Sequence, residues 1–161
     1  QNKFTSTIPF SLFSISNLRD LQIASNSLSS SIPSEIANIV SLTMLNFRSN
    51  HLNGTIPTSI SALSKLLILE LMSNEITSVI PSSMAQMQSL LYLGLFSNKL
   101  TSSIPESIGQ MQKLRYLLLQ SNSLTSEIPS ALGDMSGLLF LDLSDNSFAS
   151  TIPSTLAKLT R

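Results

Sequence analysis

Groups that could act as acids, bases, nucleophiles or metal ligands are few in this chain. It has one histidine, His51, and no cysteine, so a thiolate nucleophile, a disulfide framework and a thiolate zinc site are excluded. Serine is abundant, but a Ser-His-Asp set around His51 would arise only by the accident of that abundance. The acidic residues are scattered, and phosphate-loop, dinucleotide and metal-binding motifs are missing. We therefore predict no catalytic residue, no metal site and no cofactor, and we expect a protein that is not an enzyme.

The most informative feature of the sequence is instead a repeat with a period of 24 residues. An asparagine returns every 24 residues, and each of the seven prolines follows an isoleucine at the same spacing. The asparagines are Asn2, Asn26, Asn50, Asn74, Asn98, Asn122 and Asn146. An uninterrupted period of this length indicates a stacked solenoid with one continuous core. We treat residues 1–161 as a single domain of about seven repeats, the first and last of them incomplete.

Each repeat divides into three structural parts. Apolar residues alternate with variable ones before the asparagine, which predicts a half-buried strand that pairs in parallel with the next repeat. The asparagine can donate and accept at once, so we expect it to bond the turns of adjacent repeats. The proline suits the first turn of a short helix, some of these helices being 3₁₀. A column of small residues such as Ala85 and Gly109 lets these helices approach closely.

Composition narrows the class of partner. The formal net charge is zero and only 11% of residues are charged, which argues against nucleic acid, since that partner needs a basic surface. The apolar runs are all too short for a membrane span, so we predict no direct membrane contact by this segment. Asn53-Gly54-Thr55 is the one N-glycosylation sequon.

The outward strand positions vary while the frame stays constant, and such positions can store binding specificity. From Met44 onward they carry a band of apolar and aromatic side chains, with a few charges beside it. Strands stack about 4.8 Å apart, so the aromatic residues would form one contiguous strip. The predicted partner-binding residues are Met44, Arg48, Ile68, Glu70, Met72, Tyr92, Phe96, Tyr116, Leu118, Phe140 and Asp142. An alternative is that these side chains only stabilise the sheet through cross-strand contacts, with the charges solvated.

The pattern LxxLxLxxNxLxxxIPxxLxxL resembles the leucine-rich repeat in the 24-residue variant typical of plants. That variant occurs in the ectodomains of receptor-like kinases and receptor-like proteins and in polygalacturonase-inhibiting proteins. The resemblance implies an α/β solenoid, a curved right-handed superhelix with a concave parallel sheet, short second strands, and short α or 3₁₀ segments on the convex side. It also implies an extracellular or cell-surface location and a protein or peptide ligand.

Two features depart from the family pattern. The family usually has glycine two residues after the leucine that follows the asparagine, where this chain has mainly serine, as at Ser102. Because serine tolerates a positive φ poorly, we predict an extended backbone there. Recognisable caps are also missing, so we expect a fragment of a larger, membrane-anchored receptor.

We therefore predict a non-catalytic recognition module that binds a protein or peptide on its concave face. A rival prediction uses the serine and threonine residues before each Ile-Pro pair, which could form a flat array as in some ice-binding or structural surface proteins.

Overall fold

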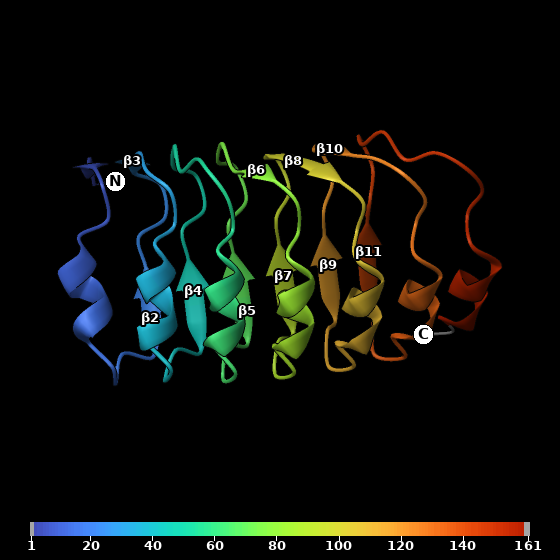
Figure 1. The fold of residues 1–161 in the computed structure, drawn as a ribbon, viewed down its shortest axis with the longest axis horizontal. Coiled ribbons are helices and arrows are strands. Elements are labelled where there is room, and N and C mark those ends of the chain that lie inside the picture. Colours follow the sequence, from blue (N-terminus) through green and yellow to red (C-terminus); the bar gives the residue numbers. More distant parts are fainter. Residues whose placement is uncertain (1, 160–161) are drawn as a thin grey trace.

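The computed structural model describes residues 2–159 as a row of similar rungs, with strands along one face and short helices along the other (Figure 1). The predicted parallel sheet is confirmed: it has six strands, in the order β11-β9-β7-β5-β4-β2. These strands are β2 (Asp20–Gln22), β4 (Met44–Asn46), β5 (Ile68–Glu70), β7 (Tyr92–Gly94), β9 (Tyr116–Leu118) and β11 (Phe140–Asp142). Each pairs with the strand of the neighbouring repeat because the 24-residue period leaves the register unchanged.

A second set of short strands follows the asparagines, as the family resemblance implied. They are β1 (Thr5–Ser6), β3 (Ser27–Leu28), β6 (Thr77–Ser78), β8 (Lys99–Ser102) and β10 (Ser123–Leu124). They form a two-stranded sheet, β1-β3, and a three-stranded sheet, β10-β8-β6. Between the two sheets a single bridge pairs Ser31 with Asn53. The second layer is therefore interrupted in the repeat that contains Asn53.

The convex side is built from 3₁₀ helices of five residues each. They are η1 (Phe10–Ser14), η2 (Ser34–Asn38), η3 (Thr58–Ala62), η4 (Ser82–Gln86), η5 (Glu106–Gln110), η6 (Ser130–Asp134) and η7 (Ser154–Lys158). The sequence predicted proline in the first turn of each helix. Proline instead lies one position earlier, at the N-cap, with an extended backbone, as at Pro81 (φ −64°, ψ 129°). Proline lacks an N–H and has a fixed φ, so it enters the helix without losing a hydrogen bond.

The core is a set of stacked apolar columns between the two faces. In the middle repeats Ile60, Leu63, Leu66, Leu69 and Leu71 are fully buried. Burial weakens at the last rung, where Ile152 is 76% exposed. Stability in such a stack comes from each rung covering the next.

The small-residue column explains how closely the helices stack. A Cβ built on Gly109 would lie 2.6 Å from the Ala131 Cβ atom, which is closer than real Cβ contacts. A Cβ on Gly133 would collide with the backbone of Thr155. The prediction that small residues permit close helix approach is therefore confirmed at η5, η6 and η7.

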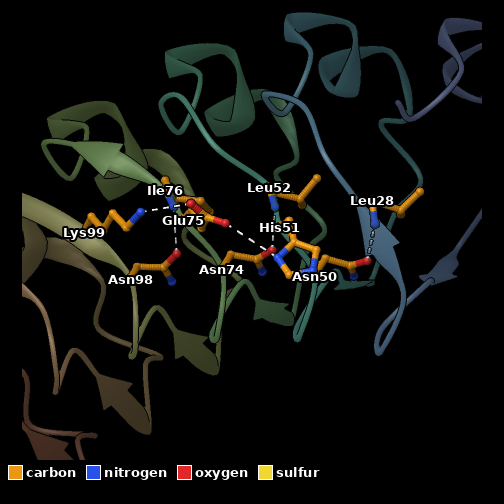
Figure 2. A network of polar contacts seen from close by, with 9 residues as sticks. All are labelled: Leu28, Asn50, His51, Leu52, Asn74, Glu75, Ile76, Asn98 and Lys99. Atoms are coloured by element: carbon orange, nitrogen blue, oxygen red, sulfur yellow. Dashed lines mark hydrogen bonds and ion pairs between the residues drawn. The ribbon is translucent and has the colours of Figure 1, made fainter. Parts of the chain in front are cut away.

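The repeated asparagines form a hydrogen-bonded ladder between rungs, as predicted (Figure 2). The Asn74 Oδ1 atom accepts from the Leu52 N–H at 3.0 Å, and its Nδ2 atom donates to the carbonyls of Phe47 and Leu71 at 3.0 Å each. Asn50 and Asn98 repeat this geometry on either side. One side chain thus satisfies backbone groups on two rungs where the chain leaves the sheet.

The predicted extended backbone of the serine column is wrong. Five of its six serines lie in the left-handed region, for example Ser78 (φ 73°) and Ser102 (φ 67°), and Gly54 in the same column has φ 69°. This conformation lets the Ser102 carbonyl accept from the Thr125 N–H of the next rung at 2.8 Å. The backbone of this column is therefore left-handed at five serines despite the local preference of serine, and its carbonyls are paired with the next rung.

The serine and threonine residues before each Ile-Pro pair do not form one flat surface. The interruption at Asn53 divides their strands into two sheets. Some of their hydroxyls also donate to the backbone of the neighbouring rung. For example, the Thr77 Oγ1 atom donates to the Gly54 carbonyl at 3.0 Å. These features leave fewer free hydroxyls than an ice-binding array would present.

Candidate partner-binding face

The concave sheet brings the predicted apolar residues into one row. Met44 pairs with Ile68, Ile68 with Tyr92, Tyr92 with Tyr116, and Tyr116 with Phe140. Side chains at paired positions of neighbouring strands project from the same face. We call these five residues the concave row. Leu118 lies two residues after Tyr116 on the same face of β9.

The aromatic end of the concave row is the most accessible part. Tyr116 is 42% exposed and Phe140 is 51% exposed, whereas Met44, Ile68 and Tyr92 are half-buried. The rings of Tyr92 and Tyr116 lie with centroids 5.8 Å apart and planes tilted by 38°, a spacing at which aromatic pairs attract. A partner can therefore contact Tyr116 and Phe140 directly, while Tyr92 supports them from the side.

Gly94 lets a neighbouring side chain lie close to the backbone in the middle of the face. A Cβ built on Gly94 would lie 2.9 Å from the Cε1 atom of Tyr92 and 3.5 Å from the Met72 sulfur. The Tyr92 ring thus lies over Gly94 and extends toward Met72. Met72 was predicted as an exposed anchor, but it is only 6% exposed and offers a partner little surface. Its sulfur lies next to Gly94 of the neighbouring strand.

Two charged side chains lie near the Met44 end of the concave row. Arg48 is exposed and Glu70 is half-buried. Burial raises the pKa of Tyr92 above its ordinary value of 10.0, the nearby Glu70 carboxylate raises it further, and the Arg48 guanidinium opposes both. The face therefore changes from mixed charge near β4 and β5 to apolar and aromatic near β9 and β11.

Phe96 and Asp142 complete the predicted set. Phe96 is half-buried, one position past the end of β7. The Asp142 Oδ1 atom accepts from the Ser144 N–H at 3.0 Å and from the Ser144 hydroxyl at 2.6 Å. One carboxylate oxygen of Asp142 is therefore already occupied in shaping the turn, and the side chain is less free to bind a partner than the sequence predicted.

Sequence reasoning missed a second apolar row. Leu67, Leu91 and Leu139 are exposed, and each stands one residue before a strand of the concave sheet. We call these three the leucine edge. Between them Arg115 turns aside, since its Nη1 atom donates to the Gly137 carbonyl at 2.6 Å. The sequence does show these leucines as a partly apolar column at the 24-residue spacing. They were missed because they stand one residue before the alternating pattern that predicts each strand.

A polar network lies at the opposite edge of the sheet, next to the asparagine ladder (Figure 2). The Lys99 Nζ atom lies 2.9 Å from one oxygen of Glu75, and the His51 Nδ1 atom lies 3.6 Å from the other. The hydrogen bond and charge of Lys99 are the largest causes that hold the pKa of Glu75 below its ordinary value of 4.5. All three side chains are largely exposed, so this is a solvated surface network and resembles no buried catalytic set.

Residues 2–159 offer little basis for a metal site or a membrane-spanning helix. No group of three or more histidine, cysteine, aspartate or glutamate side chains is placed to hold a metal ion in that range. No helix among those residues is long and apolar enough to cross a membrane. The candidate site is therefore the concave row together with the charged side chains beside it.

Comparison with solved structures gives close matches over nearly the whole chain. The leucine-rich repeat ectodomain of the membrane receptor kinase GASSHO1/SCHENGEN3 from Arabidopsis thaliana, in complex with CASPARIAN STRIP INTEGRITY FACTOR 2, matches with 36% identity and a TM-score of 0.98. The plant peptide hormone receptor RGFR1 with RGF2 matches with 32% identity and a TM-score of 0.98. The Arabidopsis receptor kinase HAESA, with the peptide hormone IDA and the co-receptor SERK1, matches with 32% identity and a TM-score of 0.97.

Each of these three matches covers 99% of this chain but only 19%, 26% and 27% of the respective solved chain. The chain therefore spans between about a fifth and a quarter of the length of these relatives. All three are in complex with a binding partner, which does not favour an ice-binding protein. A search of curated proteins found no match.

Family models agree with the solved structures. A model described as the leucine-rich repeat region matches residues 10–117, and a model of the single leucine-rich repeat matches residues 113–135 and 137–159. Together with the six-stranded parallel sheet and the asparagine ladder, these matches show that the chain belongs to the leucine-rich repeat family.

Proposed function

We propose that this chain is the recognition segment of an extracellular receptor or inhibitor, and that it binds a peptide or protein segment on its concave face without catalysing a reaction. The solved relatives support this proposal, because all three are receptors or receptor ectodomains in complex with a binding partner, which for HAESA includes the peptide hormone IDA.

The observation that carries the proposal is the exposure of Tyr116 and Phe140 side by side on adjacent strands. Large apolar side chains are costly to leave in water, and aromatic residues are enriched at the centres of interfaces. They also stand on paired strands, so a partner would meet a surface that is already ordered. Ordered surfaces lose less conformational entropy on binding.

The gradient along the face indicates the chemistry of the partner. Its apolar or aromatic side chains would contact Tyr116, Phe140 and Leu118. A polar stretch carrying charge would lie near Arg48 and Glu70, where one charge of each sign is available. An extended peptide with an apolar end and a charged end fits this arrangement.

The test is selection of 12-residue peptides from a random phage-displayed library against the immobilised chain, followed by measurement of their dissociation constants. We expect Phe140→Ala and Tyr116→Glu to weaken the selected peptides at least tenfold, since hot-spot truncations cost about 2 kcal/mol or more. Phe10→Ala is the matched control, because Phe10 is an exposed phenylalanine on the convex helix η1.

Two results would contradict the proposal. One is a selection that enriches no peptide, and the other is a set of peptides that bind equally well to the wild-type and Phe140→Ala chains. Circular dichroism of each variant separates binding from folding. If the row only stabilised the sheet, Tyr116→Ala would lower the unfolding temperature and leave the affinity of the folded fraction unchanged.

A further inference from the structure

The sequon Asn53-Gly54-Thr55 occupies an unusual place in the solenoid. It lies in the one internal repeat whose second layer is reduced to a single bridge, from Asn53 to Ser31. In the two repeats that follow, the equivalent segment overlaps β6 or β8. In the repeat after those, it begins just past the end of β10. The sequon therefore lies in the internal repeat whose second strand layer is least regular. An irregular backbone favours access by a glycosyltransferase that binds its acceptor sequence in a turn.

The side chains of the sequon are accessible. Asn53 and Thr55 are both exposed, and no hydrogen bond engages either side chain within residues 2–159. The backbone is nevertheless fixed, since the Asn53 N–H donates to the Ser30 carbonyl at 3.0 Å and the Gly54 carbonyl accepts from the Thr77 N–H at 2.7 Å. The acceptor amide is thus held in a defined place while its nitrogen and the threonine hydroxyl face solvent.

A comparison with the ladder asparagine just before it shows how different Asn53 is. Asn50 is 6% exposed, and its amide nitrogen donates to the carbonyls of Phe47 and Ile23. That amide is both buried and occupied, so it could not serve as an acceptor. Asn53 has the same functional group with neither restriction.

The first two residues of the sequon, Asn53 and Gly54, differ in type from the residues at the equivalent positions of the other repeats. The column of Asn53 otherwise contains serine, threonine or alanine, and the column of Gly54 otherwise contains serine. Gly54 adopts φ 69° without the steric cost that the serines bear. The neighbouring column members Ser29 and Thr77 are small, which leaves room for a bulky group on Asn53.

We propose that Asn53 carries an N-linked oligosaccharide, an inference that rests on the proposed extracellular location. In the transfer the Asn53 Nδ2 atom forms a bond to the anomeric carbon of an oligosaccharide donated from a lipid pyrophosphate. The bond from that carbon to the pyrophosphate oxygen breaks, the lipid pyrophosphate leaves, and one amide proton is released. The step involves no oxidation or reduction.

The position of the glycan determines which surfaces stay open. All strands of the concave sheet run in the same direction, so the sequon, which follows β4, lies at the edge where the strands end. The leucine edge precedes the strands and lies at the opposite edge. A glycan on Asn53 therefore covers the edge beside the asparagine ladder and leaves the leucine edge uncovered.

The test is expression of the full chain in insect cells behind a supplied secretion signal, with intact mass measured before and after treatment with peptide-N-glycosidase. We expect the wild-type chain to carry one glycan that the enzyme removes. Thr55→Ser keeps the sequon and should keep the glycan, whereas Thr55→Ala and Asn53→Gln should lack it. These variants differ by few atoms on an exposed surface, so all are expected to fold and be secreted.

Secreted wild-type protein with the mass of the bare chain would overturn the inference, as would a glycan that persists in Asn53→Gln. Because the secretion signal is supplied, this result does not depend on whether a peptide binds. Binding of the selected peptides to the glycosylated and deglycosylated chains is then compared, and equal affinity is expected. Glycosylated protein that binds no peptide would contradict the proposed function alone, and weaker binding with the glycan present would contradict the uncovered concave face.

Discussion

Removing one rung of the asparagine ladder should show how much the ladder stabilises the solenoid, and Asn74→Ala is the most informative change. The Asn74 side chain is almost fully buried and makes four hydrogen bonds. Its Oδ1 atom accepts from the Leu52 N–H, and its Nδ2 atom donates to the carbonyls of Phe47, Leu71 and Met72. Alanine keeps none of these bonds.

The cost can be estimated from what each backbone partner retains. The three carbonyls keep a second donor, from the Asn50 amide, the Asn98 amide and the Ser49 N–H respectively. Only the buried Leu52 N–H loses its sole partner. Leaving a buried donor unsatisfied costs about 1–3 kcal/mol, and three weakened acceptors add about 0.5 kcal/mol each. We therefore expect the free energy of unfolding to fall by about 3 kcal/mol.

The matched control is Asn26→Ala, at the first complete rung. The Asn26 Oδ1 atom accepts from the Phe4 N–H at 3.0 Å, and Phe4 is 54% exposed. Water can replace the lost acceptor there, so the expected cost is less than about 1 kcal/mol. Urea titration followed by far-ultraviolet circular dichroism measures both, with equal m values required for the comparison. Equal costs for Asn74→Ala and Asn26→Ala would refute the argument that burial of the ladder determines its contribution.

Three further tests, which use four substitutions, probe separate parts of the structure. Gly133→Ala should lower the unfolding temperature and cost about 1–3 kcal/mol, since its Cβ would collide with the backbone of η7; an unchanged temperature would contradict the close helix packing. Glu70→Gln should lower the pKa of Tyr92 but leave it above 10.0, because burial is the larger cause. Ultraviolet titration of the phenolate measures this, and below pH 10 the charge state of Tyr92 should not affect stability, whereas stability should fall as pH rises through the folded-state pKa. Ser102→Gly should stabilise the chain by about 0.5–1 kcal/mol by relieving a left-handed φ, while Ser30→Gly, where φ is not positive, should destabilise it by a similar amount.

Most of the frame follows from the sequence because identical side chains recur at identical spacing. Leu69 and Leu71 are predicted as core residues from one period, and the structure buries both completely. Asn74 is predicted as a rung-to-rung bond from its donor and acceptor groups alone, and it makes that bond. A repeated environment makes each position equivalent to its neighbours, so an inference made once holds for the stack.

The errors arose where one rung constrains another. The left-handed φ of Ser102 occurs together with a hydrogen bond that its carbonyl accepts from the next rung, and the local propensity of serine does not predict that φ. Met72 is only 6% exposed although alternation places it on the concave face, and a Cβ built on Gly94 of the next rung would lie 3.5 Å from its sulfur. Alternation along a strand predicts which face a side chain occupies, but not how far a neighbour extends over it.

The separation of frame and face explains how such a chain can bind specifically without losing stability. The core columns and the asparagine ladder fix the backbone through contacts that do not involve Tyr116 or Phe140. Those two residues are about half exposed, so roughly half of the area of each ring is left for a partner to bury. A binding partner would bury that remaining area on a surface already held in place, at about 25 cal/mol per Å². Substitutions of Tyr116 and Phe140 should therefore lower affinity as well as stability, whereas a ladder substitution such as Asn74→Ala should act mainly on stability.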